Sequence, residues 1–336
     1  MTILEAKKTI VQKIKAASKS PELDADVLLQ ALLAKDKTFV LMNRGFSLSG
    51  EQESRLREWT AARAKGLPVA YITGQKEFYG LNFFVDQSVL IPKPDTEILV
   101  ARAVQLLSDR IDARSGNKDL GAKAAAQKCG GLEVCDMCAG SGCVAISVIR
   151  ALADDERISV DKLPRWTLVD ISASALAVAQ KNASALLTPA QLEKVSFVQS
   201  NLFDALPKKF DAILSNPPYI PRKDARALLK DGRSEPLLAL DGDIAFDGSP
   251  SGTSDGLEVF RRLAFQARSH LAPGGDFLCE TGEYNAESAA EFLSRLGYGN
   301  VKIELDLEGQ KRVVCATKGL AQGFKRSAGE QTIKAR

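Results

Sequence analysis

The chain has 336 residues, 45% hydrophobic and 26% charged, values that are ordinary for a globular protein of two domains. No apolar run approaches the roughly 20 residues of a membrane helix, and charges interrupt the N-terminus where a signal peptide would be apolar, so we expect a cytoplasmic protein without membrane contact. The net charge of only +3 does not indicate a surface for nucleic-acid phosphates, so no direct nucleic-acid partner is expected.

The N-terminal part of the chain predicts helices. Apolar residues recur at helical spacing through residues 1–66, Ser49 with Gln52 suits a capping box, and Gly66 suits a helix end. We therefore expect a small helical domain over residues 1–70. Residues 71–93 follow, and their aromatic-rich run around Gly80 predicts a linking β-hairpin.

From residue 94 the pattern changes to alternating strands and helices. Pro94 and Asp95 open a helix toward Leu107, and residues 109–131 read as a loose connection. Clear helices are expected at 173–182, 257–270 and 286–296, and strands at 132–136, 166–170, 195–199, 212–215, 276–280, 301–305 and 312–317. This order predicts an α/β domain over residues 94–318, with an open, mostly parallel sheet and an antiparallel hairpin at its edge.

The last segment, residues 319–336, reads as a separate basic tail. After Thr317 there are five basic residues against the single acidic Glu330, a net charge of +4. The segment lacks apolar periodicity, so we expect it to be disordered.

Cysteine and histidine were considered as reactive or metal-binding groups. Four of the six cysteines cluster at positions 129, 135, 138 and 143, but Cys135 lies in an apolar strand and Cys143 opens a helix, so four converging ligands are not expected. We interpret these residues as small buried hydrophobes and predict no metal. The single histidine, His270, ends a predicted helix, where it suits the helix dipole.

The first motif with chemical content runs from Val134 to Gly142. A buried strand ends at Asp136, and a small-residue loop with Gly140 and Gly142 leads into a helix. Such glycines let the backbone approach a ligand at the carboxyl edge of a sheet. Cys138 stands where the first glycine of a dinucleotide-binding fingerprint would be, so this is a different loop.

Asp170 ends the next strand and is the second candidate. A carboxylate there can accept hydrogen bonds from both hydroxyls of a ribose. The alternative is that it belongs to the N-terminal cap of the next helix, where Ser172 is the more obvious capping residue. We favour ribose binding because the two motifs fall on successive strands.

The third motif, Asn216-Pro217-Pro218-Tyr219, follows an apolar strand directly. A given tetrapeptide arises by chance about once in 10⁵ positions. The alternative is a rigid loop without chemistry, but the carboxyl end of a central strand is where such sheets bind ligands.

These residue types suit chemistry at a planar NH₂ group. An amide nitrogen is a poor nucleophile, because its lone pair is delocalised into the carbonyl. The prolines lack N–H groups, so their loop offers carbonyl acceptors without competing donors, and Asn216 adds a side-chain oxygen. Such acceptors can orient the attacking lone pair and stabilise developing positive charge, while Tyr219 can supply an aromatic wall beside a cation.

Together these segments resemble the peptide chain release factor N5-glutamine methyltransferases. The resemblance covers about residues 71–317 and rests on five matches. They are the hairpin Tyr71-Ile72-Thr73-Gly74 with Phe78-Tyr79-Gly80, the segment Ile91-Pro92-Lys93-Pro94-Asp95-Thr96-Glu97, the motif Asn216–Tyr219, the segment Arg233-Ser234-Glu235-Pro236-Leu237 and the strand end Glu280-Thr281-Gly282.

The resemblance implies a Rossmann-like methyltransferase sheet that uses S-adenosylmethionine, with class I release factors as protein partners. It implies that Cys138, Ala139, Gly140, Ser141 and Gly142 wrap the methionine part of the cofactor. It further implies that Asp170 holds the ribose, that Asn201 and Leu202 lie by the adenine, and that Asn216, Pro217, Pro218 and Tyr219 grip the glutamine amide of a Gly-Gly-Gln motif, with Asn216 also near the cofactor.

The sequence departs from the family pattern in several places. Lys93 replaces the more usual Arg, Cys138 the more usual Gly, and Asn201 the commoner Asp. Extra residues occur at 109–131, 153–163 and 242–254, the last placed where it could alter access to the substrate loop.

Three other functions were weighed. An adenine methyltransferase of nucleic acid would use the same tetrapeptide, but it would usually carry a region that unstacks the base, and none is evident. A non-catalytic nucleotide-binding module would not need an intact Asn-Pro-Pro-Tyr. A glutamine methyltransferase of a ribosomal protein would resemble P-R-S-P-x-x-E where this chain has Pro92-Lys93-Pro94-Asp95-Thr96-Glu97, and this difference favours the release factor.

Overall fold

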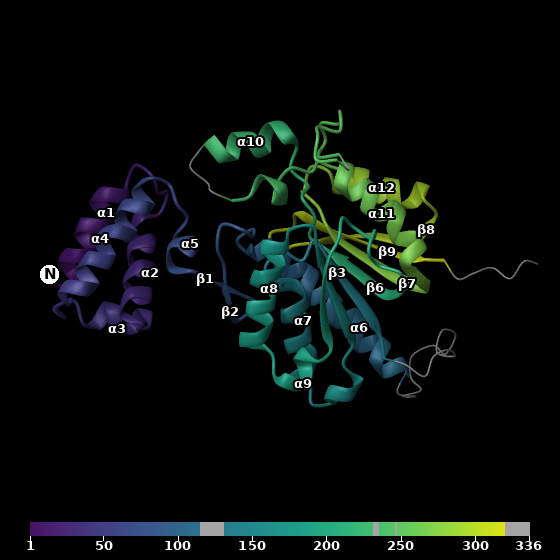
Figure 1. The fold of residues 1–336 in the computed structure, drawn as a ribbon, viewed down its shortest axis with the longest axis horizontal. Coiled ribbons are helices and arrows are strands. Elements are labelled where there is room, and N and C mark those ends of the chain that lie inside the picture. Colours follow the sequence, from purple (N-terminus) through teal and green to yellow (C-terminus); the bar gives the residue numbers. More distant parts are fainter. Residues whose placement is uncertain (115–130, 231–234, 246, 320–336) are drawn as a thin grey trace, which may run out of the picture.

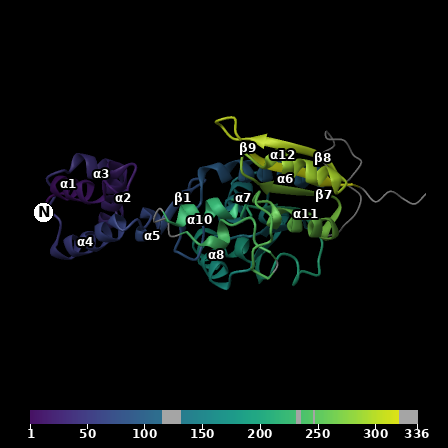
Figure 2. The same cartoon turned by 90° about the horizontal axis from the view of Figure 1, so that it is seen from above.

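The computed structural model describes residues 1–114, 131–230, 235–245 and 247–319. The predicted basic tail, apart from Gly319, lies outside these residues, as does most of the predicted connection at 109–131. A bundle of helices forms one end of the molecule and a helix-covered sheet forms the other, joined by a small hairpin (Figure 1 and Figure 2). Within the described residues, no helix combines the length and the apolar character needed to cross a membrane.

The N-terminal bundle has its own apolar core. Its helices are α1 (Ile3–Ile14), α2 (Pro21–Leu33), α3 (Lys37–Met42), α4 (Gly50–Ala64) and α5 (Val69–Thr73). Ile10, Leu28 and Leu56, from three different helices, are almost fully buried in this core. The predicted capping box of Ser49 and Gln52 is confirmed, since each side chain accepts a hydrogen bond from the other residue's backbone N–H.

A two-stranded antiparallel hairpin links the bundle to the sheet. Its strands are β1 (Gln75–Phe78) and β2 (Leu81–Phe84), as the sequence predicted. The buried side chain of Asn182, on helix α8, binds both backbone groups of Phe84 in β2. The amide of Asn182 thus takes the place of a neighbouring strand at this edge.

The large sheet has seven strands in the order β5-β4-β3-β6-β7-β9-β8. The first five strands in this order are parallel, while β9 is antiparallel to both its neighbours, so the predicted mostly parallel sheet with an antiparallel edge hairpin is confirmed. The strands are β3 (Glu133–Met137), β4 (Arg165–Asp170), β5 (Val195–Gln199), β6 (Phe210–Ser215), β7 (Leu271–Glu280), β8 (Tyr298–Leu305) and β9 (Lys311–Lys318).

Helices cover both faces of this sheet (Figure 1). Helices α6 (Glu97–Arg114), α7 (Cys143–Ala153) and α8 (Ala173–Leu186) pack on one face, and α11 (Glu258–His270) and α12 (Ala286–Arg295) on the other. Successive residues of β3 belong to opposite cores: Val134 faces α7 and Cys135 faces α11. Shorter elements are η1 (Pro94–Thr96), η2 (Val160–Lys162), α9 (Pro189–Leu192), α10 (Arg222–Lys230) and η3 (Leu237–Ala239).

The two largest errors in the predicted boundaries concern α6 and β7. Helix α6 does not end near Leu107 but continues to Arg114, because Arg110 and Arg114 form ion pairs with Asp276 and Asp211 of the sheet. Strand β7 does not begin at Asp276 but at Leu271, and its pairing with β6 shifts register between Leu271 and Asp276. Both differences arise from contacts with distant parts of the sheet, which are ion pairs for α6 and strand pairing for β7.

Candidate active site

The loop after β3 has a left-handed backbone at three alternate positions. The φ angles of Cys138, Gly140 and Gly142 are +61°, +54° and +78°. A Cβ atom on Gly142 would lie 3.0 Å from Ile146 Cδ1 and 3.3 Å from Ala179 Cβ, so glycine lets the loop pack closely on helices α7 and α8. Cys138 adopts a conformation that glycine adopts more easily.

Asp170 joins this loop to the next strand. One carboxylate oxygen accepts a hydrogen bond from Gly140 N at 2.9 Å, and the other accepts one from Ser172 N at 2.9 Å. Ser172 itself caps α8 by accepting from Ala175 N. Burial raises the pKa of Asp170, and the backbone N–H groups oppose this shift. A carboxylate has about four lone-pair sites, so acceptor capacity remains for a ligand beside these backbone hydrogen bonds.

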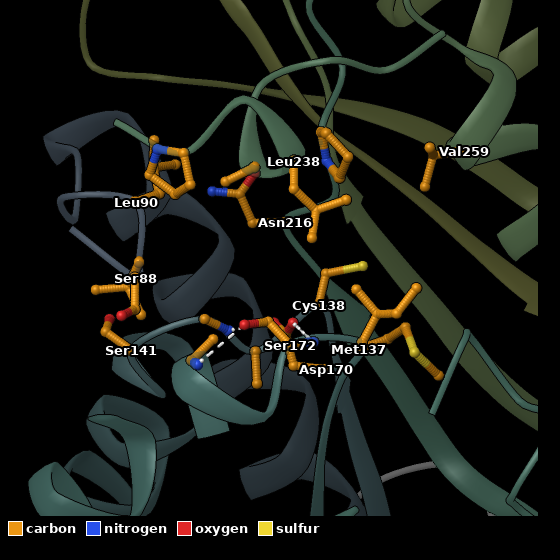
Figure 3. Close-up of a pocket in the computed structure, with 18 of the residues that line it drawn as sticks. Ser88, Leu90, Met137, Cys138, Ser141, Asp170, Ser172, Asn216, Leu238 and Val259 are labelled. Carbon is orange, nitrogen blue, oxygen red and sulfur yellow. Dashed lines mark hydrogen bonds between the residues drawn. The ribbon is translucent and has the colours of Figure 1, made fainter. Parts of the chain in front are cut away.

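A cavity of about 440 Å³ opens at the carboxyl edge of the sheet, within the usual range for a small-molecule site. Asp170 and Ser172 lie at one end of it, and Asn216 and Leu90 lie at the other (Figure 3). Most of the predicted site residues line this cavity, namely Cys138, Ala139, Gly140, Ser141, Asp170, Asn201, Leu202, Asn216 and Pro218.

Three predicted site residues do not line the cavity: Gly142, Pro217 and Tyr219. Gly142 begins α7 and packs against the helices, as described above. The Tyr219 hydroxyl donates a hydrogen bond to Glu280 Oε1 at 3.1 Å. The aromatic wall expected from Tyr219 is therefore not part of this cavity, and its contact with a substrate stays a prediction.

Asn216 is held by a residue that the sequence argument did not assign to the site. Its side-chain Nδ2 donates to Thr96 Oγ1 at 3.0 Å, and no described residue donates to its Oδ1. The carbonyl oxygen of Pro218, which also lines the cavity, accepts no hydrogen bond from the described residues. Side-chain and backbone acceptors thus remain available at this end of the cavity, as an NH₂ ligand would require.

Two buried carboxyl groups near the cavity were also missed as site residues. Glu280, at the end of β7, and Asp136, in β3, are each 1% exposed. Burial raises the pKa of both carboxyls to about 7, and Asp136 also lies on the cavity wall. The sequence signal was present, since both residues fall at or near the carboxyl end of a predicted strand, where such sheets gather ligands.

The inserted segment at 242–254 is fastened to the tetrapeptide loop. A Cβ atom on Gly242 would lie 2.0 Å from Gly256 O, and one on Gly256 would lie 2.1 Å from Tyr219 O. Asp243, which is 1% exposed, accepts hydrogen bonds from Arg222 N, Thr253 Oγ1 and Gly256 N. Gly242 and Gly256, which flank most of this segment, therefore pack their backbone directly against Tyr219.

The segment at 91–96 also lines the cavity, through Pro92, Lys93 and Thr96. Lys93 pairs with the buried Glu235 at 2.7 Å, and Glu235 also accepts from Ile91 N at 3.3 Å. The lysine that replaces the family's more usual arginine therefore has a carboxylate partner. Together these contacts tie the segment before α6 to the chain that follows the tetrapeptide loop.

The cysteines and the histidine have structural surroundings. Cys135 is buried in β3, and burial raises the pKa of the Cys143 thiol to about 12, so both thiols are neutral at physiological pH. Cys138 lines the cavity, and Cys129 lies outside the described residues. His270 ends α11 as predicted and stacks on Phe203 with ring centroids 4.4 Å apart.

Comparison with known proteins places this chain in a family. The family models described as "PrmC N-terminal domain" and "Methyltransferase small domain" match residues 5–74 and 117–235. Among solved structures, a methyltransferase from Pyrococcus furiosus has a TM-score of only 0.44 at 16% identity, covering 81% of this chain and all of that one.

Curated relatives match almost from end to end. A release factor glutamine methyltransferase from Coxiella burnetii is 33% identical over 95% of this chain and 100% of its own length. The enzyme of the same name from Leptospira interrogans is 35% identical, covering 95% and 98% of the two chains, and that from Escherichia coli is 32% identical, covering 88% and 92%. This chain belongs to the release factor glutamine methyltransferase family.

Proposed function

We propose that this protein transfers a methyl group from S-adenosylmethionine to the side-chain amide nitrogen of the glutamine in the Gly-Gly-Gln motif of class I release factors. The observation that carries the proposal is the position of Asn216. Asn216, whose Oδ1 accepts no hydrogen bond from the described residues, lines one end of a cavity together with Pro218, and the other end holds Asp170 (Figure 3). The reaction would take place in the cytoplasm, where release factors act.

The cavity has the features that the cofactor needs. Its volume of about 440 Å³ suits a nucleoside with an amino-acid side chain, and Asp170 retains lone pairs for the ribose hydroxyls. Asn201 and Leu202 supply a polar and an apolar group farther along the wall for the adenine. The loop from Cys138 to Gly142 would follow the methionine part. When bound, S-adenosylmethionine supplies an electrophilic methyl group on its sulfonium sulfur.

The residues of the tetrapeptide act on the glutamine amide. Asn216 Oδ1 and the proline-loop carbonyls accept hydrogen bonds from the substrate NH₂ group, which points its lone pair toward the cofactor. They also stabilise the positive charge that the nitrogen gains as the N–C bond forms. No strong base is required in contact with the nitrogen, because its proton becomes acidic after methylation.

The N-terminal bundle would hold the rest of the partner. A single glutamine side chain offers too few contacts for specificity, so a second surface is needed. The bundle predicted over residues 1–70 has its own core and extends through α5 to Thr73, and the hairpin of β1 and β2 follows it. Glycines beside the target glutamine would let its backbone enter a narrow pocket.

Mass spectrometry of a release factor after incubation with the protein and cofactor tests the proposal. One added methyl group on the Gly-Gly-Gln glutamine is expected. Asn216→Ala should lower the rate on the order of 100-fold while leaving cofactor affinity nearly unchanged, whereas Asn82→Ala on the exposed hairpin should leave both unchanged. Methylation of ribosomal protein or nucleic acid with no mark on the release factor would refute the assignment.

A further inference from the structure

Three residues from distant parts of the chain meet beside the cavity. Thr96 comes from the turn η1, Asn216 from the loop after β6, and Glu280 from the end of β7. Thr96 and Glu280 are each 1% exposed, and Asn216 is half-buried. Of the three, Thr96 and Asn216 line the cavity, while Glu280 lies behind them.

Within this group of residues, one donor, the Thr96 hydroxyl, and one acceptor, Glu280 Oε2, remain without a hydrogen-bond partner among the described residues. Thr96 Oγ1 accepts a hydrogen bond from Asn216 Nδ2, so the hydroxyl hydrogen of Thr96 is still available to be donated. Glu280 Oε1 accepts from the Tyr219 hydroxyl, and Oε2, which is buried, has no partner among the described residues. The Thr96 hydroxyl is the group that most lowers the pKa of Glu280. Buried polar groups are normally paired, and the effect of Thr96 on the pKa of Glu280 indicates that the two side chains are close, so we expect the Thr96 hydroxyl to donate to Glu280 Oε2.

The polarity of the Asn216 amide depends on what Thr96 does. The two ends of an asparagine amide have nearly the same shape, but one donates hydrogen bonds and the other accepts them. A threonine hydroxyl can do either, so by itself it does not select one orientation. An ionised carboxylate can only accept. Beside such a carboxylate, Thr96 must donate to it and is left to accept from Asn216 Nδ2.

We propose that Glu280 is a positioning residue that acts through Thr96 to keep Asn216 Oδ1 turned toward the substrate. The inference rests on the proposed function, because an acceptor at this point matters for a ligand that presents an NH₂ group. With the amide reversed, Asn216 would present its own NH₂ group to the substrate NH₂ group, and two donors would face each other.

The charge of Glu280 then controls the arrangement. Burial raises the pKa of this carboxyl to about 7, with Asp95 adding to the shift and the Thr96 and Tyr219 hydroxyls and Arg312 opposing it. Burial is the main cause that raises the pKa of the thiols of Cys143 and Cys279, and Glu280 in turn helps to raise it. Once protonated, Glu280 can donate to Thr96, which frees Thr96 to donate to Asn216 Oδ1. Methyl transfer should therefore weaken as the pH falls through the pKa of Glu280.

The test compares single-turnover methyl transfer to a release factor between pH 5.5 and 8.5 in four variants and the wild type. Glu280→Gln removes the charge, and Thr96→Val removes the hydroxyl at nearly constant volume. Both should transfer at least about 10-fold more slowly at pH 8.5, with little change in KM, and both should lose the acid limb of the wild-type profile. Thr96→Ser keeps the hydroxyl and should therefore keep the wild-type transfer rate and the acid limb of the pH profile. Glu291→Gln, on the exposed surface of α12, should behave as wild type.

Calorimetric affinity for S-adenosylmethionine and circular dichroism show whether each variant is folded. If Glu280→Gln does not fold, Thr96→Val provides the test. Wild-type rate and acid limb in Glu280→Gln or in Thr96→Val would overturn the inference. No transfer to release factor by the wild type would instead overturn the proposed function.

Discussion

Asn182 joins the linking hairpin to the cofactor loop, and its replacement tests how rigidly the two are coupled. Its side chain is 1% exposed and makes three hydrogen bonds with backbone groups. Oδ1 accepts from Phe84 N at 2.7 Å, and Nδ2 donates to Phe84 O at 3.0 Å and to Ser141 O at 2.9 Å. The first two bonds hold β2, and the third holds the loop that lines the cavity.

Asn182→Ala should destabilise the protein by about 3 kcal/mol, at about 1 kcal/mol for each lost hydrogen bond. The loss should be larger if water does not reach the released backbone groups to bind them. Urea unfolding gives this value. Hydrogen exchange should show faster exchange of the Phe84 amide, because its only side-chain acceptor is gone. Affinity for S-adenosylmethionine should fall too, since Ser141 loses a bond that orders its loop.

The control is Ser184→Ala, an exposed position on the same helix, which should change neither stability nor affinity. If Asn182→Ala unfolds within about 0.5 kcal/mol of the wild type and protects Phe84 equally well, the hairpin does not depend on this side chain and the reasoning is refuted.

Three further predictions concern single residues. Asp170→Ala should weaken cofactor binding by about 1.5–3 kcal/mol in calorimetry, and Asp170→Asn, which keeps an acceptor for Gly140 N, should weaken it less; equal affinity in all three proteins would place the ribose elsewhere. Burial raises the pKa of Asp136 from its ordinary value of 3.8 to about 7, so the folded state binds more protons between these values and stability falls as the pH rises through this window. Thermal melts from pH 5 to 8 should show this fall, and Asp136→Asn should flatten it except for the part due to Glu280; an unchanged slope would contradict the assignment. Gly256→Ala should slow methyl transfer and lower the melting temperature, because its Cβ would lie 2.1 Å from Tyr219 O, whereas Gly252→Ala, where no atom lies within 4 Å, isolates the smaller cost of a positive φ; equal effects of the two would exclude the backbone contact.

Local signals in the sequence were sufficient for most elements. The capping box at Ser49 and Gln52, the apolar runs of β3 to β6 and the helix opening at Cys143 depend on residues within a few positions of one another. The same is true of the carboxyl-edge motifs, because each follows its own strand directly. Parallel strands bring such ends together whatever the connections between them, so the sequence indicated that Gly140, Asp170 and Asn216 share one cavity.

The tertiary structure alone decided which residues support these groups. Thr96 and Glu280 are 184 positions apart, and nothing local shows that they flank Asn216. The extension of α6 to Arg114 likewise depends on carboxylates of the sheet. In each case a buried polar group must find a partner, and that partner is selected by the packing of strands and helices rather than by neighbours in the chain. Sequence patterns therefore identify the residues that face the ligand, whereas the residues that orient them are found only in the folded protein.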